Sequence, residues 1–540
     1  QKGDIVDGYP LGRNPRGQKS LPIVITYKNK NVREKVQDAA KSASIWNGRR
    51  RKNKPRGTVG YFTAAYKTMD HMRMTKDEIR KAIRKTKRNS APGPDGVKMA
   101  VFAEACDTIL EPLMILYNSI NDTGMIPENF KTARVIMLHK KNSKQEMGNY
   151  RPISMSNHIS KLWERVFNAR LMQHLDKNNR LSRHQHGFRP KRGCHTNLIE
   201  TWETGIDLTD EHGPTVEIWS FDLQKAFDLL DHGKSLDLCH AAGIGEFVGE
   251  SLANWLTNRT QYVQCGEKTS TNRTVNRSCV QGSVLGPTLW LIYIQSLLDR
   301  LENKCQYSAY ADDVTIVAKI GNKKQKKEFK RLLKILLKWG EDYGMKWGAH
   351  KTQRMSMRYN NCRAKDPPRM FFDGNDIKSG DTLDTLGVIL NKGGIGYAHL
   401  SKVRRKIAGI RTMVAKNYRI RTQRILEMIY TTYITPHINY CSSQWNTNVE
   451  AHLRGIDIEL KRFWKLSQTK LRPSNIMGLH EQLIYNDLKQ VHKIMHDKST
   501  IKFDDIFKMN MRFPWPGTNS CSKFAAKVGK KRFAKSTRRI

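Results

Sequence analysis

Long hydrophobic runs are scarce in this chain of 540 residues. The longest clear run, Leu289–Ile294, is far shorter than the roughly 18 apolar residues that a membrane-spanning helix needs. We therefore expect no membrane span and interpret the run as a buried strand or helix turn. The chain begins at Gln1 with neither an initiator Met nor an apolar signal region, which predicts a fragment without a secretory address, located in the nucleus or cytoplasm.

Paired cysteines are absent as well. The nine Cys residues include no CxxC pair, and their number is odd. This pattern argues against a disulfide framework or a zinc knuckle and favours reduced, buried thiols. His184 and His186, and again His492 and His496, have spacings compatible with metal binding, but no further ligands stand nearby. We interpret both pairs as core or surface histidines.

Acidic residues are few relative to basic ones. The chain has 95 Lys plus Arg against 50 Asp plus Glu, a formal net charge of +45. Such a field attracts polyanions, either nucleic acid or an anionic membrane surface, and the lack of apolar spans favours nucleic acid. The hydrophobic fraction of 38% is sufficient to form a core, which excludes a chain disordered throughout.

Local signals divide the chain into segments. Leu21–Tyr27 has the composition of a strand, and Gly48–Gly57 is a basic stretch that reads either as a solvated linker or as a phosphate-binding arm. Thr75–Glu78 forms a capping box that predicts the start of a helix. Apolar residues at helical spacing predict mostly helix over 399–496. Lys523–Arg539 is basic and lacks acids.

Carboxylates occur in two places where a strand is expected to end. Asp222 directly follows the β-rich run Thr215–Phe221. In Tyr307–Ala318, two strand-like runs flank Asp312 and Asp313, as in a hairpin. Adjacent acids at a turn repel each other, and either solvent or a bound divalent cation relieves that repulsion.

Nucleotidyl transfer gives a chemical reason to prefer the cation. One metal ion activates a 3′-hydroxyl, and a second holds the triphosphate and stabilises the leaving pyrophosphate. Three carboxylates converging from two neighbouring strands can bridge two Mg²⁺ ions, which prefer hard oxygen ligands.

Several motifs in this chain resemble those of the non-LTR (LINE-type) reverse transcriptase family. They occur in the family's order over about 300 residues. In chain order they are Ser90–Gly96 (SAPGPDG), Asn149–Ser154 (NYRPIS), His186–Pro190 (HGFRP), Phe221–Asp228 (motif A), Gln281–Pro287 (motif B), Tyr310–Asp313 (YADD, motif C), Lys351–Thr352 (motif D) and Leu386–Val388 (primer grip).

This resemblance implies an α+β fold of the right-hand polymerase type, with fingers, an antiparallel-sheet palm and a helical thumb. The expected segments are a small basic segment (1–46) that weakly resembles the C-terminal part of a retrotransposon ORF1 protein, a basic linker (47–74), fingers (75–210), palm (211–390), thumb with a helical extension (391–500) and a basic tail (501–540).

The resemblance also implies roles for individual residues. Asp222, Asp312 and Asp313 would hold two Mg²⁺ ions, or alternatively Mn²⁺, and Lys351 would act as a general acid toward pyrophosphate. The fingers cations and motif B would bind the nucleotide, and an aromatic ring would exclude a 2′-hydroxyl. The residues implied are Lys140, Lys141, Arg151, Phe227, Gln281 and Gly282 for nucleotide binding, and Arg189 and Gly387 for nucleic-acid binding.

The implied activity is RNA-directed DNA synthesis, with an RNA template, a DNA primer and dNTPs as partners and no membrane. No endonuclease-like segment or CCHC knuckle is visible, so we expect any required nuclease activity to be supplied elsewhere. The sequence departs from the family at Ser278–Val280, where Gly-Val-Pro is usual. A catalytically decayed, nucleic-acid-binding relic is therefore an alternative. A group II intron maturase shares the palm without a feature favouring it, and a telomerase is disfavoured because no template-RNA-binding domain is recognisable.

Overall fold

A computed structural model describes residues 68–501, with gaps at 70, 141, 211–215, 358–367, 393–395, 447–449 and 497. Outside this range it describes only the backbone of four strands, at 5–10, 23–27, 507–509 and 524–526. Backbone contacts divide the chain into one unit at 1–66, described only through the antiparallel pair β1–β2, and a second at 67–540. The strand expected within Leu21–Tyr27 is confirmed as β2 (Ile23–Tyr27). The basic stretch Gly48–Gly57 and most of the basic tail lie outside the described residues.

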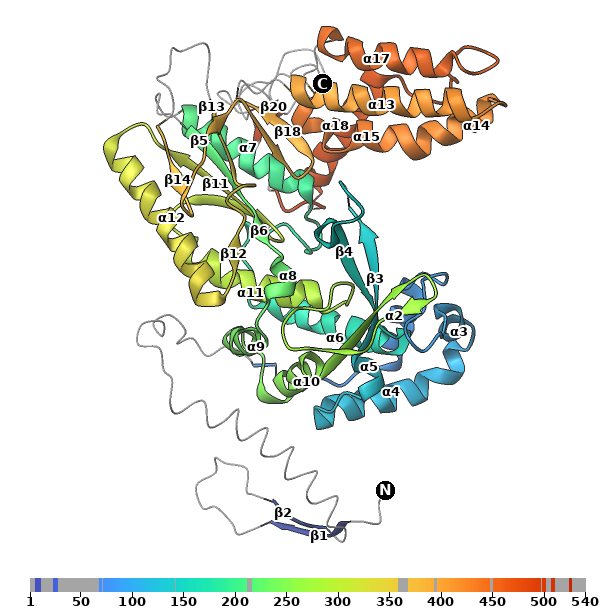
Figure 1. Cartoon of the computed structure of the whole chain (residues 1–540), viewed down its shortest axis with the longest axis vertical. Helices are drawn as coiled ribbons and strands as arrows, with labels where there is room; N and C mark the ends of the chain where they lie inside the picture. Colours follow the sequence, from blue (N-terminus) through green and yellow to red (C-terminus); the bar gives the residue numbers. More distant parts are fainter. Residues whose placement is uncertain are drawn as a thin grey trace. The chain divides into compact units, whose positions relative to one another are not determined.

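The second unit combines helices and sheets, which confirms the α+β class (Figure 1). In chain order the elements are β1 (Ile5–Pro10), β2 (Ile23–Tyr27), α2 (Lys76–Lys85), α3 (Met99–Glu104), α4 (Cys106–Thr123), α5 (Glu128–Lys131), β3 (Thr132–His139), η1 (Met147–Asn149), β4 (Tyr150–Met155), α6 (His158–Lys177), α7 (Cys194–Asp210), β5 (Val216–Phe221), β6 (Leu223–Gln224), α8 (Ala226–Leu229), α9 (His232–Ala241), α10 (Glu246–Leu256), β7 (Arg259–Cys265), β8 (Lys268–Thr269), β9 (Arg273–Val275), α11 (Gly286–Leu301), β10 (Gln306–Tyr310), β11 (Asp313–Lys319), α12 (Lys323–Tyr343), β12 (Lys346–Trp347), β13 (Gln353–Met357), β14 (Phe371–Phe372), β15 (Asn375–Asp376), β16 (Ser379–Gly380), β17 (Thr382–Thr385), β18 (Val388–Asn391), α13 (Tyr397–Asn417), α14 (Gln423–Ile429), η2 (Tyr430–Ile434), α15 (Thr435–Asn439), α16 (Ser442–Trp445), α17 (Glu450–Trp464), α18 (Leu479–Met495), β19 (Phe507–Met509) and β20 (Phe524–Ala526).

The central sheet has the strand order β10-β11-β5-β13-β16, antiparallel except for the last pair. Its strand β5 is covered on both faces, because successive side chains point to opposite sides of a strand. Val216 and Ile218 belong to a cluster shared with α7, whereas Trp219 and Phe221 pack in the cluster that contains Phe329 of α12. Both faces of β5 are therefore buried, so a substrate can reach only the residues that follow its end, such as Asp222.

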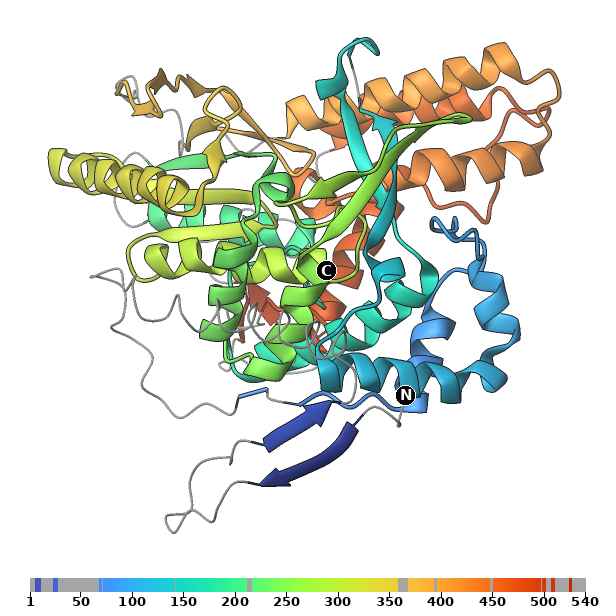
Figure 2. The same ribbon diagram turned by 60° about the horizontal axis from the view of Figure 1, so that its bottom comes forward.

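The second large sheet has the order β4-β3-β7-β8, with β9 also paired to β7. Strand β7 lies parallel to β3, where Arg134 stands opposite Tyr262 and Val135 opposite Val263 (Figure 2). The segment that follows α10 is thereby joined to the hairpin β3–β4, although more than a hundred residues separate them in the chain.

Helices α2 to α5 precede β3 of this second sheet in the chain, and α6 follows β4. The capping box predicted at Thr75 is confirmed: its hydroxyl accepts the backbone N–H of Glu78, and the Glu78 carboxylate accepts the N–H of Thr75 at 2.9 Å. Met74 and Ile79 are both buried in the main core, as a hydrophobic staple requires. Glu78 also binds Arg170 of α6 at 2.8 Å, which links the start of α2 to its neighbour.

The helices α13 to α18 confirm the helical prediction for 399–496. They have a hydrophobic core of their own, in which α13 packs along α17. Among the described residues, none of the helices combines the length and apolar character needed to cross a bilayer. The run Leu289–Ile294 lies within α11, where its side chains are buried.

Candidate active site

The structure brings the three predicted aspartates to the same edge of the central sheet. Asp222 directly follows β5, and Asp312 and Asp313 stand at the turn between β10 and β11. Val314 of β11 pairs with Phe221 of β5, so the residues one step beyond each, Asp313 and Asp222, occupy neighbouring strand ends. The predicted hairpin is thus confirmed, and its register sets the carboxylates side by side.

The electrostatics of this edge show how closely the carboxylates lie. Burial raises the pKa of Asp312, and the charge of Asp222 raises it further. Burial, followed by the charges of Asp312 and Asp222, raises the pKa of Asp313 to about 7. A raised carboxyl pKa means that burial and the neighbouring carboxylates disfavour the ionised form of the group.

Lys351 is the nearest cation. Its Nζ lies 3.1 Å from Oδ2 of Asp222, and its side chain is 58% exposed. The backbone N–H of Gly348 donates to the carbonyl of Asp222 at 2.8 Å. A Cβ at Gly348 would stand 2.7 Å from Oδ2 of Asp222, so a glycine is needed for this approach. The loop carrying Lys351 is therefore held against Asp222.

Within the described residues, no group of three or more His, Cys, Asp or Glu side chains stands in a metal-holding arrangement. The Asp222 carboxylate is instead paired with Lys351. The donor set nevertheless suits a hard divalent cation, because it is made of carboxylate oxygens, and the charges of Asp222 and Asp312 raise the pKa of Asp313. In this structure, Lys351 supplies the positive charge next to Asp222.

Motif B forms a turn at a glycine that fits closely against β4. Gly282 has φ +105°, and a Cβ there would lie 2.6 Å from the carbonyl oxygen of Ser154. The N–H of Ser154 donates to the carbonyl of Gln281 at 2.7 Å. The Gln281 side chain donates to Asp228 Oδ1 at 2.9 Å, which ties motif B to the helix that follows Asp222.

Phe227 lies in this same corner, half-buried. Its ring packs against Trp290 of α11 at 5.6 Å between centroids and meets Phe188 edge-on at 6.2 Å. Its carbonyl accepts the N–H of Cys279. The ring therefore packs partly in the core, and its contact with a sugar stays a prediction.

The predicted fingers cations are placed by the hairpin β3–β4. Arg151 is exposed on β4, opposite Leu138. Its charge is near enough to Asp312 to oppose part of the rise in the pKa of that carboxyl group. Lys140 is exposed at the end of β3, and its N–H donates to the carbonyl of Asn149. Lys141 lies outside the described residues.

The two predicted nucleic-acid contacts differ in their surroundings. Arg189 donates to the carbonyl of Ser182 at 2.6 Å and to Asp176 at 2.9 Å, and these bonds favour a role in positioning its loop. Gly387 has φ +77° in the turn between β17 and β18, and its carbonyl accepts Lys402 Nζ at 2.9 Å. Nucleic-acid binding by either residue stays a prediction.

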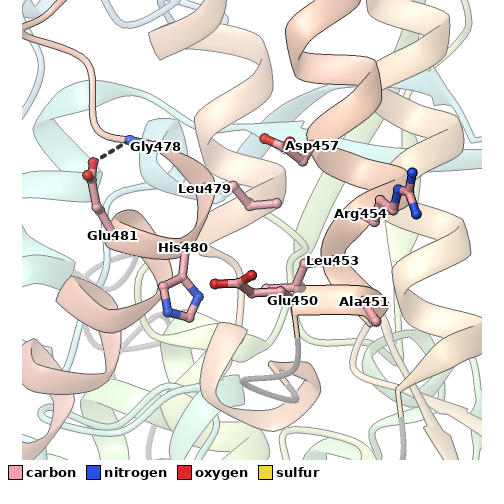
Figure 3. Close-up of a pocket in the computed structure, with 9 residues that line it drawn as sticks. All are labelled: Glu450, Ala451, Leu453, Arg454, Asp457, Gly478, Leu479, His480 and Glu481. Carbon is pink, nitrogen blue, oxygen red and sulfur yellow. Dashed lines mark hydrogen bonds between the residues drawn. The ribbon is translucent and has the colours of Figure 1, made fainter. Parts of the chain in front are cut away.

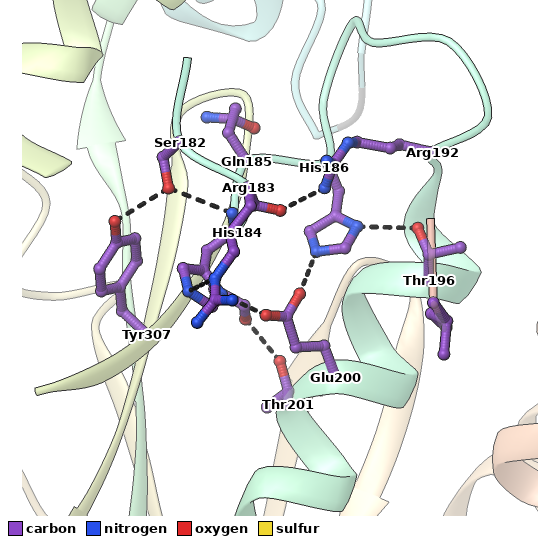
Figure 4. Close-up of polar contacts among 12 residues, drawn as sticks. Ser182, Arg183, His184, Gln185, His186, Arg192, Thr196, Glu200, Thr201 and Tyr307 are labelled. Carbon is purple, nitrogen blue, oxygen red and sulfur yellow. Dashed lines mark hydrogen bonds and ion pairs between the residues drawn. The ribbon is translucent and has the colours of Figure 1, made fainter. Parts of the chain in front are cut away.

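Sequence reasoning missed the polar residues that support the catalytic turn from behind. Gln185 is buried and hydrogen-bonds the backbone of Ala311, and Glu200 of α7 joins His184 and His186 (Figure 4). The available signal was a set of polar residues, Ser182–Gln185, directly before the HGFRP motif.

A cavity of about 480 Å³ lies elsewhere, between α17 and α18 (Figure 3). Its lining is partly acidic and shares no residue with the carboxylate edge. The residues that line it are Glu450, Ala451, Leu453, Arg454, Asp457, Gly478, Leu479, His480 and Glu481.

Comparison with known proteins agrees with this geometry. Residues 138–390 match the family described as reverse transcriptase (RNA-dependent DNA polymerase), and this range contains Asp222, Asp312 and Asp313. The chain is 23% identical over 399 residues to the RNA-directed DNA polymerase from mobile element jockey of Drosophila melanogaster, covering 71% of this chain and 43% of that protein.

Two proteins of type-1 retrotransposable elements are similar as well. A putative 115 kDa protein in element R1DM of Drosophila melanogaster is 26% identical over 69% of this chain and 36% of its own length. A Pol polyprotein from element R1 of Bradysia coprophila is 25% identical over 68% and 37%. The chain thus spans less than half the length of these relatives.

A solved structure of apo telomerase from Candida tropicalis aligns with 70% of this chain and 67% of its own, at 12% identity and a TM-score of 0.37, which is too low to argue from. The family match rests instead on the sequence range that carries the carboxylate edge. Residues 138–390 of this chain thus match the reverse transcriptase family, and the chain is similar to RNA-directed DNA polymerases of non-LTR retrotransposons.

Proposed function

We propose that this chain copies RNA into DNA by adding dNTPs to the 3′-hydroxyl of a primer. The observation that carries this proposal is the convergence of Asp222, Asp312 and Asp313 at one edge of an antiparallel sheet, inside the range that matches reverse transcriptases. The expected partners are an RNA template, a DNA primer and dNTPs, and the formal net charge of +45 suits such polyanions.

The right-hand architecture is part of the same proposal. In it, 75–210 are the fingers, 211–390 the palm and 391–500 the thumb with its helical extension. The segments 1–46, 47–74 and 501–540 are basic additions. The central sheet beneath the carboxylates and the separate core of the α13–α18 helices support the assignment of palm and thumb.

Asp222, Asp312 and Asp313 would hold two divalent cations, Mg²⁺ or Mn²⁺. Bound there, the ions would lower the pKa of the primer hydroxyl and neutralise charge on the transferring phosphate and the leaving pyrophosphate. For Asp222 to serve, Lys351 must exchange its carboxylate contact for another anion, and its exposure permits this.

The remaining site residues bind and orient the substrates. Lys351, released from Asp222, would donate a proton to the leaving pyrophosphate. Arg151, with its forked guanidinium, would contact the triphosphate. Gln281 and Gly282 would bring backbone close to the new base pair, and the ring of Phe227 would lie under the sugar, where it would collide with a 2′-hydroxyl.

Primer extension on poly(rA)/oligo(dT) with Mg²⁺ tests this function. We expect extension by the unaltered chain and a loss of at least about 100-fold in Asp222→Asn, Asp312→Asn or Asp313→Asn, because even residues that only orient metal ligands cost about 10–100-fold. Asp376→Asn, at an exposed position of β15, is the matched control and keeps full activity.

Template–primer binding is measured alongside, and we expect it to stay nearly intact in all variants, since each removes a single charge. Near-normal extension by one of the aspartate variants would remove that residue from the proposed site. Binding without any extension by the unaltered chain would identify a decayed relic, the alternative raised by the departure at Ser278–Val280.

A further inference from the structure

We propose that Gln185 is a positioning residue that holds the catalytic turn Ala311–Asp313 in its active geometry. The proposal rests on the function proposed above for the turn. Gln185 touches neither substrate nor metal ligand side chain. It acts through the backbone of Ala311, the residue directly before Asp312.

The carboxamide of Gln185 brackets one residue of the turn. Its Oε1 accepts the N–H of Ala311 at 2.9 Å, and its Nε2 donates to the carbonyl of Ala311 at 3.2 Å. The side chain is 1% exposed, so water does not compete for these bonds. Both polar groups of a single alanine are thereby satisfied by one side chain from a segment 126 residues away.

Ala311 needs such support because its backbone is strained. Its φ of +56° lies in the left-handed region, which residues other than glycine rarely adopt. A conformation of this kind costs about 1–3 kcal/mol and persists only where the surroundings hold it. Ala311 also sets the direction in which the chain enters Asp312, so relaxation of this φ moves the carboxylate.

The segment that carries Gln185 is fixed against the sheet. It lies along β10: Ala309 donates to the carbonyl of His184 at 2.9 Å, and its own carbonyl accepts the N–H of His186 at 2.7 Å. At Gly187, a Cβ would stand 2.3 Å from the backbone N of Ala311. Only glycine permits this approach, and Oε1 of Gln185 accepts the Gly187 N–H at 2.8 Å.

A partly buried carboxylate holds the segment from the other side. Glu200 of α7 binds Nδ1 of His184 with one oxygen and Nε2 of His186 with the other, on either side of Gln185 (Figure 4). Burial alone would raise the pKa of Glu200, but the two imidazole donors lower it to about 2. The carboxylate is therefore ionised at neutral pH and holds both histidines.

Two substitutions separate the hydrogen bonds of Gln185 from the space that its side chain fills. Gln185→Met keeps the length of the side chain but removes donor and acceptor. Gln185→Glu keeps the acceptor for Ala311 and Gly187 but removes the donor to the Ala311 carbonyl. Thr201→Val is the matched control: it removes the buried 2.6 Å bond between α7 and Ser308 of β10 without touching Ala311.

We expect Gln185→Met to lower kcat by about 10–100-fold and to raise the Mg²⁺ concentration for half-maximal extension, as the loss of groups that orient metal ligands does. The KM for dNTP and the affinity for template–primer stay within about twofold. Gln185→Glu falls between the unaltered chain and Gln185→Met. Thr201→Val lowers the unfolding temperature but leaves the Mg²⁺ dependence unchanged.

The rise in unfolding temperature on adding Mg²⁺ gives a readout that needs no activity. We expect it to shrink in Gln185→Met and to persist in Thr201→Val. If Gln185→Met fails to fold, the comparison is made on Gln185→Glu. Wild-type Mg²⁺ dependence in the Gln185 variants, or equal changes in Thr201→Val, would overturn the proposal. A chain that shows the Mg²⁺ shift but no extension would contradict the proposed function instead.

Discussion

At the scale of single residues, the candidate site depends on a balance of charge. Three carboxylates are gathered at one edge of the sheet, where burial disfavours the ionisation of Asp312 and Asp313, and Lys351 lies against Asp222. Around them, Gly187, Gly282 and Gly348 stand where a Cβ would meet backbone or carboxylate atoms closer than 3 Å. The site therefore combines charged groups with positions that tolerate no side chain.

Phe227 carries a prediction at this scale. We expect Phe227→Val to raise rNTP incorporation relative to dNTP, because the shorter side chain no longer collides with a 2′-hydroxyl. Steric discrimination by one small group is worth about 1–3 kcal/mol, so the preference should shift by about 10- to 200-fold. Single-nucleotide extension with matched rNTP and dNTP measures it.

Thermal unfolding is the control for this substitution, since the ring also packs on Trp290. Unaltered sugar preference in a variant that unfolds at a lower temperature would assign Phe227 to core packing alone.

At the scale of elements, a buried histidine connects the hairpin β17–β18 to the α13–α18 helices. Hairpin β17–β18 joins the helical region through His399 of α13, which is 3% exposed and accepts the N–H of Ile389 of β18 at 3.3 Å. Its ring packs against Trp445 of α16. Burial, together with the charge of Lys402, lowers the pKa of His399 to about 4.

This shift predicts a pH dependence of stability. A histidine whose pKa is lower in the folded than in the unfolded state stabilises the fold fully above about pH 6.5, and this stability is lost as the pH falls toward 4. We expect the unfolding temperature to decrease over that interval, and to decrease less in His399→Gln, which keeps an acceptor for Ile389. The same substitution at exposed His437 is the control and leaves the profile unchanged. Identical pH profiles for His399→Gln and the unaltered chain would contradict this account.

At the scale of the whole molecule, net charge governs association with nucleic acid. Part of the excess positive charge lies on α12. The apolar face of this helix packs in the main core, and its outer face carries exposed lysines. These are Lys323, Lys324, Lys327, Lys330, Lys334 and Lys338. Cationic contacts to phosphates displace condensed counterions, so binding weakens as salt rises.

We expect affinity for duplex DNA to fall by about 10³–10⁵ between 50 and 200 mM salt if six to ten phosphates are contacted, with a shallower slope on single strands. Deleting Lys523–Ile540 removes eight cations and no acids, and should lower both the affinity and the slope of log K against log salt. Fluorescence anisotropy over a salt series measures both quantities.

Replacing Arg49, Arg50 and Arg51 by Gln tests the other basic segment in the same way, and single-nucleotide chemistry should survive either change. Unaltered slopes in both variants would locate the phosphate contacts in other parts of the chain, α12 among them.

Much of the local structure follows from sequence alone. The cap of α2 at Thr75, strand β5 with Asp222 at its end, the β10–β11 hairpin and the glycine turn at Gly282 were all predictable. Each is decided by hydrogen bonding, side-chain alternation or steric limits within a few residues. Such signals are written in contiguous sequence and need no knowledge of distant partners.

The partners of the buried polar groups were decided only by the tertiary structure. Lys351 meets Asp222 across 129 positions, and Gln185 meets Ala311 across 126. Glu217, buried near the start of β5, has its counter-ion in Arg354, 137 positions away. Breaking a buried pair of this kind costs about 3–5 kcal/mol, which makes the partner essential. Yet its identity follows from sheet register and helix packing, which are set by the burial of the whole core and not by any local run of residues.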